Sequence, residues 1–243
     1  MIVSKASGAR RVVSLEGALP WLLAVSGLSI LVALYAAFVY APEEATMGQV
    51  QRIFYFHVPA AWIAFLAYFV VFVAGVGYLR TRRMSWDVVA RCSAEIGVLF
   101  TTLALVTGSL WAKPVWGTWW SWEPRLTTTM VLWLIYVGYL LLRSAIPQPD
   151  QRAVFASVLG IVGFVDVPIV FGSIRWWRTV HPVVVDTGGF DMARPMLVAL
   201  LVSVAAFTML YVVLMLVRVS LEHSKEDLER LRRAVGLQAE EEV

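Results

Sequence analysis

Residues 196–217 read MLVALLVSVAAFTMLYVVLMLV, a run of 22 residues without a charged side chain. A helix rises about 1.5 Å per residue, so this run reaches across the roughly 30 Å hydrocarbon core of a bilayer. Five further stretches are long and apolar enough to cross: residues 19–40, 58–79, 92–111, 126–142 and 153–174. Because unpaired backbone groups are too costly in lipid, each must be a helix. The sequence therefore predicts an all-α integral membrane protein with six transmembrane helices.

The composition supports this class. The chain is 60% hydrophobic and 15% charged, whereas soluble proteins are about 45–50% apolar and about 25% charged. The net charge of +3 does not indicate nucleic-acid binding, because the basic residues flank apolar stretches. The single cysteine, Cys92, excludes an internal disulfide and a multi-thiolate metal site, and we expect it to be a small packing residue. We expect no cleaved signal peptide, because the first apolar run is long enough to span.

The basic residues also predict the orientation. If the N-terminus is inside, 14 of the 20 lysines and arginines fall in inner segments. The positive-inside rule then places both termini in the cytoplasm. We divide the chain into a transmembrane domain, residues 1–220, and a charged cytoplasmic tail, residues 221–243. The tail is either a short cytoplasmic helix, with Leu221, Leu228, Leu231 and Val235 near one face, that rests on a partner, or a solvated, frayed segment.

Residues 111–122, WAKPVWGTWWSW, hold five of the eleven tryptophans. We expect Trp116, Trp119, Trp120 and Trp122 to lie in an outer loop that Gly117 breaks and that Pro114 and Pro124 bound. Tryptophan is a large, flat, apolar side chain with one N–H donor. The residues alone leave two interpretations: a shelf for a flat apolar ligand, or an unusually dense aromatic belt at the membrane interface.

Two of the three histidines, His57 and His181, fall on the same outer side. Neutral imidazole is a good iron ligand, so two histidines on opposite faces of a planar macrocycle would form a porphyrin site. The alternative is that each is a hydrogen-bonded interfacial residue. The outer Arg125, Arg175 and Arg178 are able to bind carboxylates in bidentate fashion, or are ordinary interfacial arginines.

Two charged residues fall inside the predicted spans. Asp166 precedes Pro168 within the fifth span. An ionisable residue there suggests a functional site, although it is equally able to satisfy backbone groups freed by the proline or to pair with an arginine. We expect a kink at this proline. Glu95 is expected to pair with Arg91 at i,i+4 spacing or to extend toward the interface.

Residues 108–127, GSLWAKPVWGTWWSWEPRLT, resemble the tryptophan-rich WWD motif of the haem-handling proteins of bacterial cytochrome c maturation, and most closely the haem exporter C family. The segments FHVPAA (56–61) and WWRTVH (176–181) follow the same family's order. The resemblance implies that His57 and His181 are axial ligands of haem iron. It assigns the surrounding contacts to these residues: Trp116, Gly117, Trp119, Trp120, Trp122, Glu123 and Arg125. Arg178 joins them in our hypothesis as a propionate partner. The family commonly has Trp-Asp-Ala-Arg where this chain has Trp122-Glu123-Pro124-Arg125.

The resemblance implies a protein of the bacterial inner membrane that is not an enzyme. It would hold haem b as cargo at the outer face and deliver it to a membrane-anchored haem chaperone. The implied complex partners are an ATP-binding-cassette ATPase, a permease subunit and a small single-span subunit. The chain has no GxxxxGK[ST] motif, so ATP hydrolysis would come from a partner. Two alternatives stay open: a cytochrome c synthase-like subunit, which usually has more spans and an outer domain, and a haem-transporter permease subunit, which predicts polar residues through the bundle.

Overall fold

The computed structural model describes residues 3–177, 185, 186, 189, 190 and 192–241. Its long helices are α1 (Val3–Tyr35), α2 (Phe54–Thr81), α3 (Met84–Trp116), α4 (Pro124–Ala145), α5 (Pro149–Phe164), α6 (Asp166–Trp176) and α7 (Arg194–Glu241). The π-helix η1 (Ala36–Tyr40) extends α1, and the 3₁₀-helix η2 (Gln49–Ile53) leads into α2. A hairpin of β1 (Val185–Asp186) and β2 (Gly189–Phe190) pairs Val185 with Phe190.

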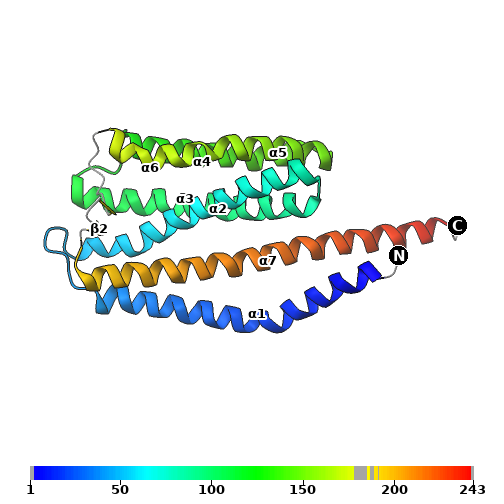
Figure 1. The fold of residues 1–243 in the computed structure, drawn as a ribbon, viewed down its shortest axis with the longest axis horizontal. Helices are drawn as coiled ribbons and strands as arrows, with labels where there is room; N and C mark the ends of the chain where they lie inside the picture. Colours follow the sequence, from blue (N-terminus) through cyan, green and yellow to red (C-terminus); the bar gives the residue numbers. More distant parts are fainter. Residues whose placement is uncertain (1–2, 178–184, 187–188, 191, 242–243) are drawn as a thin grey trace.

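Six helical segments are long and apolar enough to cross a membrane. They are Gly17–Tyr40, Gln49–Thr81, Met84–Trp116, Pro124–Ala145, Pro149–Trp176 and Arg194–Arg233. The predicted six-helix, all-α membrane fold is therefore confirmed. The helices run nearly parallel in one elongated bundle, and both chain ends lie at the same end of it (Figure 1). We call this the terminal end, and the opposite end, where residues 117–123 connect α3 to α4, the loop end.

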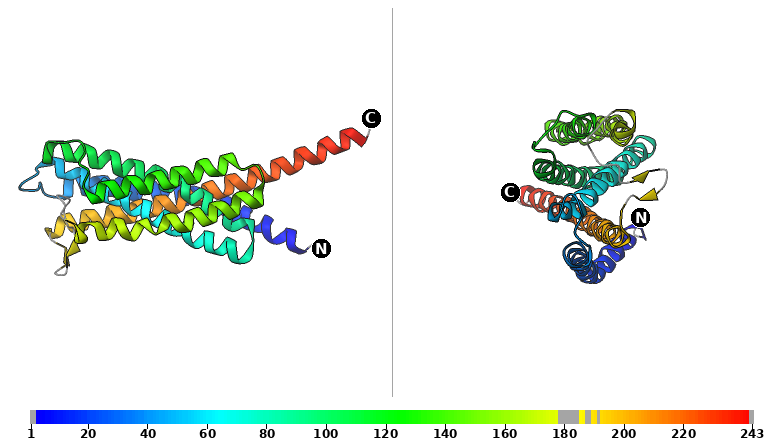
Figure 2. Two further views of the ribbon diagram at one scale, coloured as in Figure 1. Left: turned by 90° about the horizontal axis from the view of Figure 1, so that it is seen from above. Right: turned by 90° about the vertical axis from the view of Figure 1, so that its left-hand side faces the viewer.

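Helices α2 and α3 form the centre of the bundle. Helix α2 packs against α3, α5 and α7, while α1 pairs with α7 on one side and α4 packs on α3, α5 and α6 on the other (Figure 2). Small residues allow this close approach. A Cβ atom at Gly97 of α3 would lie 2.6 Å from Cε1 of Tyr68 on α2, so glycine is required where these helices cross.

Two stacked tyrosines close the middle of the bundle. The rings of Tyr68 and Tyr136 lie 3.6 Å apart between centroids with an interplanar angle of 12°. The Tyr68 hydroxyl shares a 2.7 Å hydrogen bond with Thr101, and the Tyr136 hydroxyl donates to the Gly160 carbonyl at 3.1 Å. All of these side chains are buried and their polar atoms are satisfied. The core of the bundle is therefore packed rather than open.

The fifth span is broken at the predicted place. Helix α5 ends at Phe164, and α6 begins at Asp166, two residues before Pro168. Proline has no N–H to continue the helical ladder, which explains the interruption. The Asp166 Oδ2 atom is buried and has no hydrogen-bond partner among the described residues.

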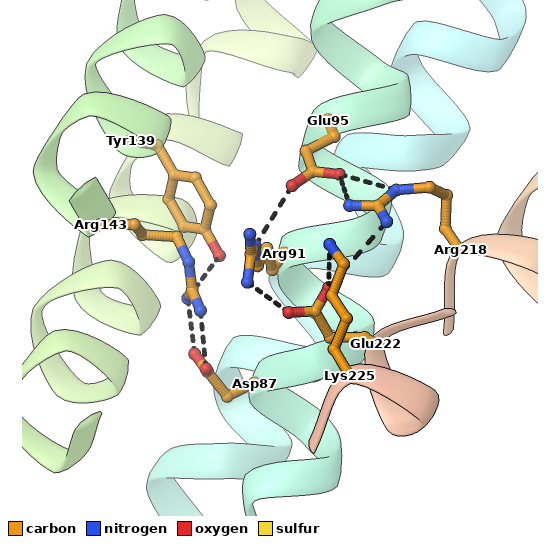
Figure 3. A network of polar contacts seen from close by, with 8 residues as sticks. All are labelled: Asp87, Arg91, Glu95, Tyr139, Arg143, Arg218, Glu222 and Lys225. Atoms are coloured by element: carbon orange, nitrogen blue, oxygen red, sulfur yellow. Dashed lines mark hydrogen bonds and ion pairs between the residues drawn. The ribbon is translucent and has the colours of Figure 1, made fainter. Parts of the chain in front are cut away.

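Charged side chains gather at the terminal end (Figure 3). Arg91 contacts Glu95 at 3.2 Å, which confirms the predicted i,i+4 pair. The structure adds two partners from α7, because Arg218 also binds Glu95 and Glu222 binds Arg91 at 2.6 Å. Asp87 of α3 and Arg143 of α4 form a separate, buried pair. These contacts join α3 to α4 and α7.

The segment after residue 220 is helical. Helix α7 continues without a break to Glu241 and projects beyond the rest of the bundle (Figure 1). The helical conformation of the first interpretation is confirmed, while its cytoplasmic location and its contact with a partner stay predictions. Leu221, Leu228, Leu231 and Val235 are all exposed along it.

Candidate functional site

The tryptophan segment begins on a helix rather than in a loop. We expected Trp116 in the loop, but it is the last residue of α3, and Pro114 lies inside that helix. The expectation was wrong because a proline in the last turn removes only one helical hydrogen bond, so α3 continues until Gly117. Gly117 adopts the left-handed conformation with φ 76°, and its N–H donates to the Lys113 carbonyl at 3.0 Å. This is a common glycine C-cap.

The loop from Gly117 to Glu123 is short and locally bonded. The Thr118 hydroxyl donates to the Trp120 carbonyl at 2.8 Å. Pro124 is the first residue of α4, where its missing N–H costs nothing and its fixed φ suits a helix. The Glu123 carbonyl accepts the Thr127 N–H at 3.0 Å. The Glu123-Pro124 pair thus forms the start of α4.

A cavity of about 250 Å³ lies beneath this loop at the loop end of the bundle. Its walls come from α2, α3, the loop and α4. Its aromatic and ionisable side chains are His57, Trp111, Trp116, Trp120, Glu123 and Arg125, and four hydroxyl residues also line it. Much of the remaining wall is apolar and includes Ala61, Phe65, Ala104 and Leu126. The arrangement suits a flat apolar ligand that also carries polar groups.

His57 occupies the first turn of α2 and is held by α3. Its Nδ1 atom lies 3.1 Å from Oγ1 of Thr107. The Trp111 indole meets the imidazole edge-to-face, with ring centroids 6.0 Å apart and an interplanar angle of 63°. A Cβ atom at Gly108 would lie 3.0 Å from Cε1 of His57. The ring is therefore enclosed by one face of α3.

Three nitrogen atoms of the cavity residues have no hydrogen-bond partner among the described residues. They are Nε1 of Trp111, Nε1 of Trp120 and Nη1 of Arg125, and all three are buried. Buried donors without partners are unusual in native proteins. Here they belong to residues that line one cavity, so a ligand with acceptor atoms in that cavity would satisfy them.

The structure brings together some of the residues selected from the sequence. His57, Trp116, Trp120, Glu123 and Arg125 line the cavity, while Gly117 caps α3 above it. Trp119 and Trp122 do not line it, and they are 55% and 73% exposed at the surface of the loop. His181 and Arg178 lie outside the described residues, so their positions relative to the cavity stay a prediction.

Two residues of the candidate site, Thr107 and Trp111, were not predicted from the sequence. Helical spacing could have indicated them, because positions 104, 107, 108 and 111 fall on one face of α3. That face carries a small residue, a hydroxyl, a glycine and an indole. It is the face that contacts His57 and the cavity.

Comparison with known proteins identifies relatives over most of the chain. The family model described as "Heme exporter protein C" matches residues 2–234. A heme exporter protein C of Bradyrhizobium diazoefficiens is 40% identical over 198 residues, covering 81% of this chain and 75% of the relative. The Rhodobacter capsulatus protein of the same name is 36% identical over 220 residues, covering 88% of this chain and 90% of the relative. A heme exporter protein C of Escherichia coli K12 is 38% identical over 164 residues, covering 67% of this chain and 66% of the relative.

The fold and the site define a class of protein: a multi-pass membrane protein with a cavity lined by aromatic side chains at one end of its helix bundle. The sequence matches identify the family. The chain belongs to the heme exporter protein C family. It is a haem-handling membrane protein of cytochrome c biogenesis, as the resemblance implied.

Proposed function

We propose that this protein presents haem at the outer face of the bacterial inner membrane and delivers it to a membrane-anchored haem chaperone. The observation that carries the proposal is the cavity at the loop end. It joins the His57 imidazole, the indoles of Trp111, Trp116 and Trp120, and the Arg125 guanidinium. In this proposal haem b is cargo, and the protein is not an enzyme.

Haem fits the chemistry of these residues. Its iron takes an imidazole nitrogen, its macrocycle packs on apolar and aromatic walls, and its propionates accept hydrogen bonds from guanidinium and indole N–H groups. The three buried donors without partners among the described residues supply such bonds. We assign His181 as the second axial ligand and Arg178 as a further propionate partner, following the resemblance.

The size of the cavity supports presentation of the ligand. Its roughly 250 Å³ is less than the about 300–1,000 Å³ of pockets that enclose a drug-sized ligand. A haem would therefore insert one edge and leave the rest at the mouth. Trp119 and Trp122 are exposed there and offer apolar surface to the remaining part or to the docked chaperone.

The packed core supports presentation over conduction. A permease for haem would need a path along the bundle, whereas the Tyr68–Tyr136 stack and its hydrogen bonds fill the middle. The short segment between α3 and α4 offers no separate outer domain of the cytochrome c synthase type. We infer that the ATPase, permease and small single-span subunits of the complex supply movement and energy.

The orientation is part of the proposal. Both termini lie at the terminal end (Figure 1), whereas the cavity is lined by residues of the loop end. The excess of lysine and arginine belongs to segments at the terminal end. Positive residues favour the cytoplasmic side. Termini in the cytoplasm would place the cavity at the outer face, where the chaperone is anchored.

The test is an absorption spectrum of the detergent-purified protein. We expect a haem Soret band in the parent protein and its loss in the His57→Ala/His181→Ala double variant. His223→Ala is the matched control, because this third histidine lies in the tail. Full haem occupancy with an unchanged spectrum in the double variant would overturn the ligand assignment. Haem transfer to the chaperone without the ATPase would separate presentation from pumping.

A further inference from the structure

The Thr107 hydroxyl lies between the backbone of α3 and the His57 imidazole. Its Oγ1 atom donates to the Leu103 carbonyl at 2.7 Å. The same oxygen lies 3.1 Å from Nδ1 of His57. A hydroxyl has one hydrogen to donate and lone pairs to accept with. Two carbonyls of its own helix, those of Leu103 and Ala104, are within reach of that hydrogen. A hydroxyl that donates to either one is left to accept, so we assign the contact as Nδ1–H of His57 donating to Thr107.

This contact selects one tautomer of the imidazole. In neutral histidine one ring nitrogen carries the hydrogen and the other carries the lone pair. A hydrogen on Nδ1 leaves the lone pair on Nε2, the nitrogen that then serves as a metal ligand. The two ring nitrogens are distinguished in this way at metal sites, where the hydrogen bond of one sets the role of the other.

Neighbouring residues fix the plane of the ring as well. Gly108 leaves space that a side chain would fill, because its added Cβ would lie 3.0 Å from Cε1 of His57. Trp111 contacts the ring edge-to-face from one turn further along α3. Residues 107, 108 and 111 hold the imidazole through a hydrogen bond, a close approach and an aromatic contact, and the Ala104 backbone adds a further hydrogen bond.

We infer that Thr107 is a positioning residue that orients His57 and sets its tautomer for binding haem iron. This inference rests on the proposed function and extends it to a residue that does not itself line the cavity. A hydrogen bond from Nδ1–H increases electron donation from the coordinating nitrogen. Thr107 would therefore stabilise the ferric state and strengthen the iron–imidazole bond.

The experiment compares three substitutions of one residue. Thr107→Val keeps the shape of the branched side chain but removes the hydroxyl that accepts the hydrogen bond. Thr107→Ala removes both the branched shape and the hydroxyl. Thr107→Ser keeps the hydroxyl. Loss of a hydrogen-bonding partner of a metal ligand typically weakens binding roughly 10- to 100-fold. We expect Thr107→Val and Thr107→Ala to weaken haem binding by about tenfold, raise the reduction potential of bound haem and shift its Soret band. Thr107→Ser should restore all three.

Thr128→Val is the matched control. Thr128 of α4 also donates to carbonyls of its own helix, those of Pro124 and Arg125, and it does not line the cavity. The Thr128→Val substitution should leave the reduction potential and the absorption spectrum of bound haem unchanged. A merely structural role of Thr107 would lower thermal stability without moving the reduction potential, and that result would overturn the inference.

The two hypotheses fail in different ways. If His57→Ala loses haem while Thr107→Val keeps the parent potential and affinity, the positioning role is wrong and the proposed function stands. If His57→Ala itself keeps full haem occupancy and spectrum, the proposed ligand is wrong. If Thr107→Val does not accumulate in the membrane, the comparison of Thr107→Ala with Thr107→Ser decides: equal potentials in the two variants would overturn the inference.

Discussion

The Arg143 guanidinium donates two parallel hydrogen bonds to the Asp87 carboxylate. Nη1 lies 2.6 Å from Oδ1 and Nη2 lies 2.7 Å from Oδ2. The two side chains are only 6% and 4% exposed, and the Tyr139 hydroxyl lies 3.4 Å from Nη1 (Figure 3). The pair joins α3 to α4 at the terminal end, opposite the cavity. It is a structural element of the bundle rather than part of the site.

Breaking this pair should destabilise the protein strongly. Arg143→Met leaves the Asp87 carboxylate buried without its cation, which we expect to cost about 3–5 kcal/mol. The Asp87→Leu/Arg143→Met double variant should be much closer to the parent, since no lone charge stays buried. Unfolding in detergent followed by circular dichroism measures both. Arg91→Met is the control, because Arg91 is 37% exposed and should contribute about 0–1 kcal/mol. Equal losses in Arg143→Met and Arg91→Met would contradict the prediction.

The left-handed conformation of Gly117 should matter for the loop. An added Cβ at Gly117 meets nothing within 4 Å, so Gly117→Ala acts through backbone strain alone. We expect a loss of about 1–2 kcal/mol and weaker haem binding as Trp120 moves. Gly117→Asn should lose less, since asparagine tolerates this conformation. Gly138→Ala is the control, because Gly138 also has open space but lies within α4. Parent haem affinity in Gly117→Ala would show that the cap does not position the loop.

Arg125 should recognise the propionates rather than the iron. Its buried Nη1 atom has no partner among the described residues and belongs to the cavity wall. A hydrogen bond to a charged group contributes about 1.5–3 kcal/mol, so Arg125→Gln should weaken haem binding roughly 10- to 100-fold. Binding of haem dimethyl ester should change little. The exposed Arg175, at the end of α6, serves as the control through Arg175→Gln. An equal loss for haem and its ester would argue against propionate recognition.

The proposed orientation predicts a pattern of cysteine labelling. The native Cys92 is buried with 0% exposure, so it should not react with a membrane-impermeant maleimide. Ala45→Cys, at the loop end, should be labelled in intact cells from which the outer membrane has been removed. Ser224→Cys, beyond the terminal end, should be labelled only after the inner membrane is opened. Both positions are exposed, and the reverse pattern would invert the topology.

The sequence predicted features that depend on neighbours along the chain. The six spans follow from the length of each apolar run, and the break before Pro168 follows from its missing N–H. The Arg91–Glu95 pair lies within one helical turn. The end of α3 was misplaced by five residues, at 111 instead of 116, because Pro114 looked like a helix boundary, whereas Gly117 provides the real one.

The sequence by itself determined the class and the number of spans, and it supplied the aromatic and histidine residues that we propose for a haem site. Only the tertiary structure decided which of these side chains share a cavity: Trp116 and Trp120 line it, whereas Trp119 and Trp122 do not. It also paired Asp87 with Arg143, 56 residues away, and brought Thr107 to His57. The physical reason is that lipid is as apolar as a packed core. A transmembrane helix is hydrophobic all round, so its pattern does not indicate which face meets a neighbour, and only the packing of all the helices fixes that rotation.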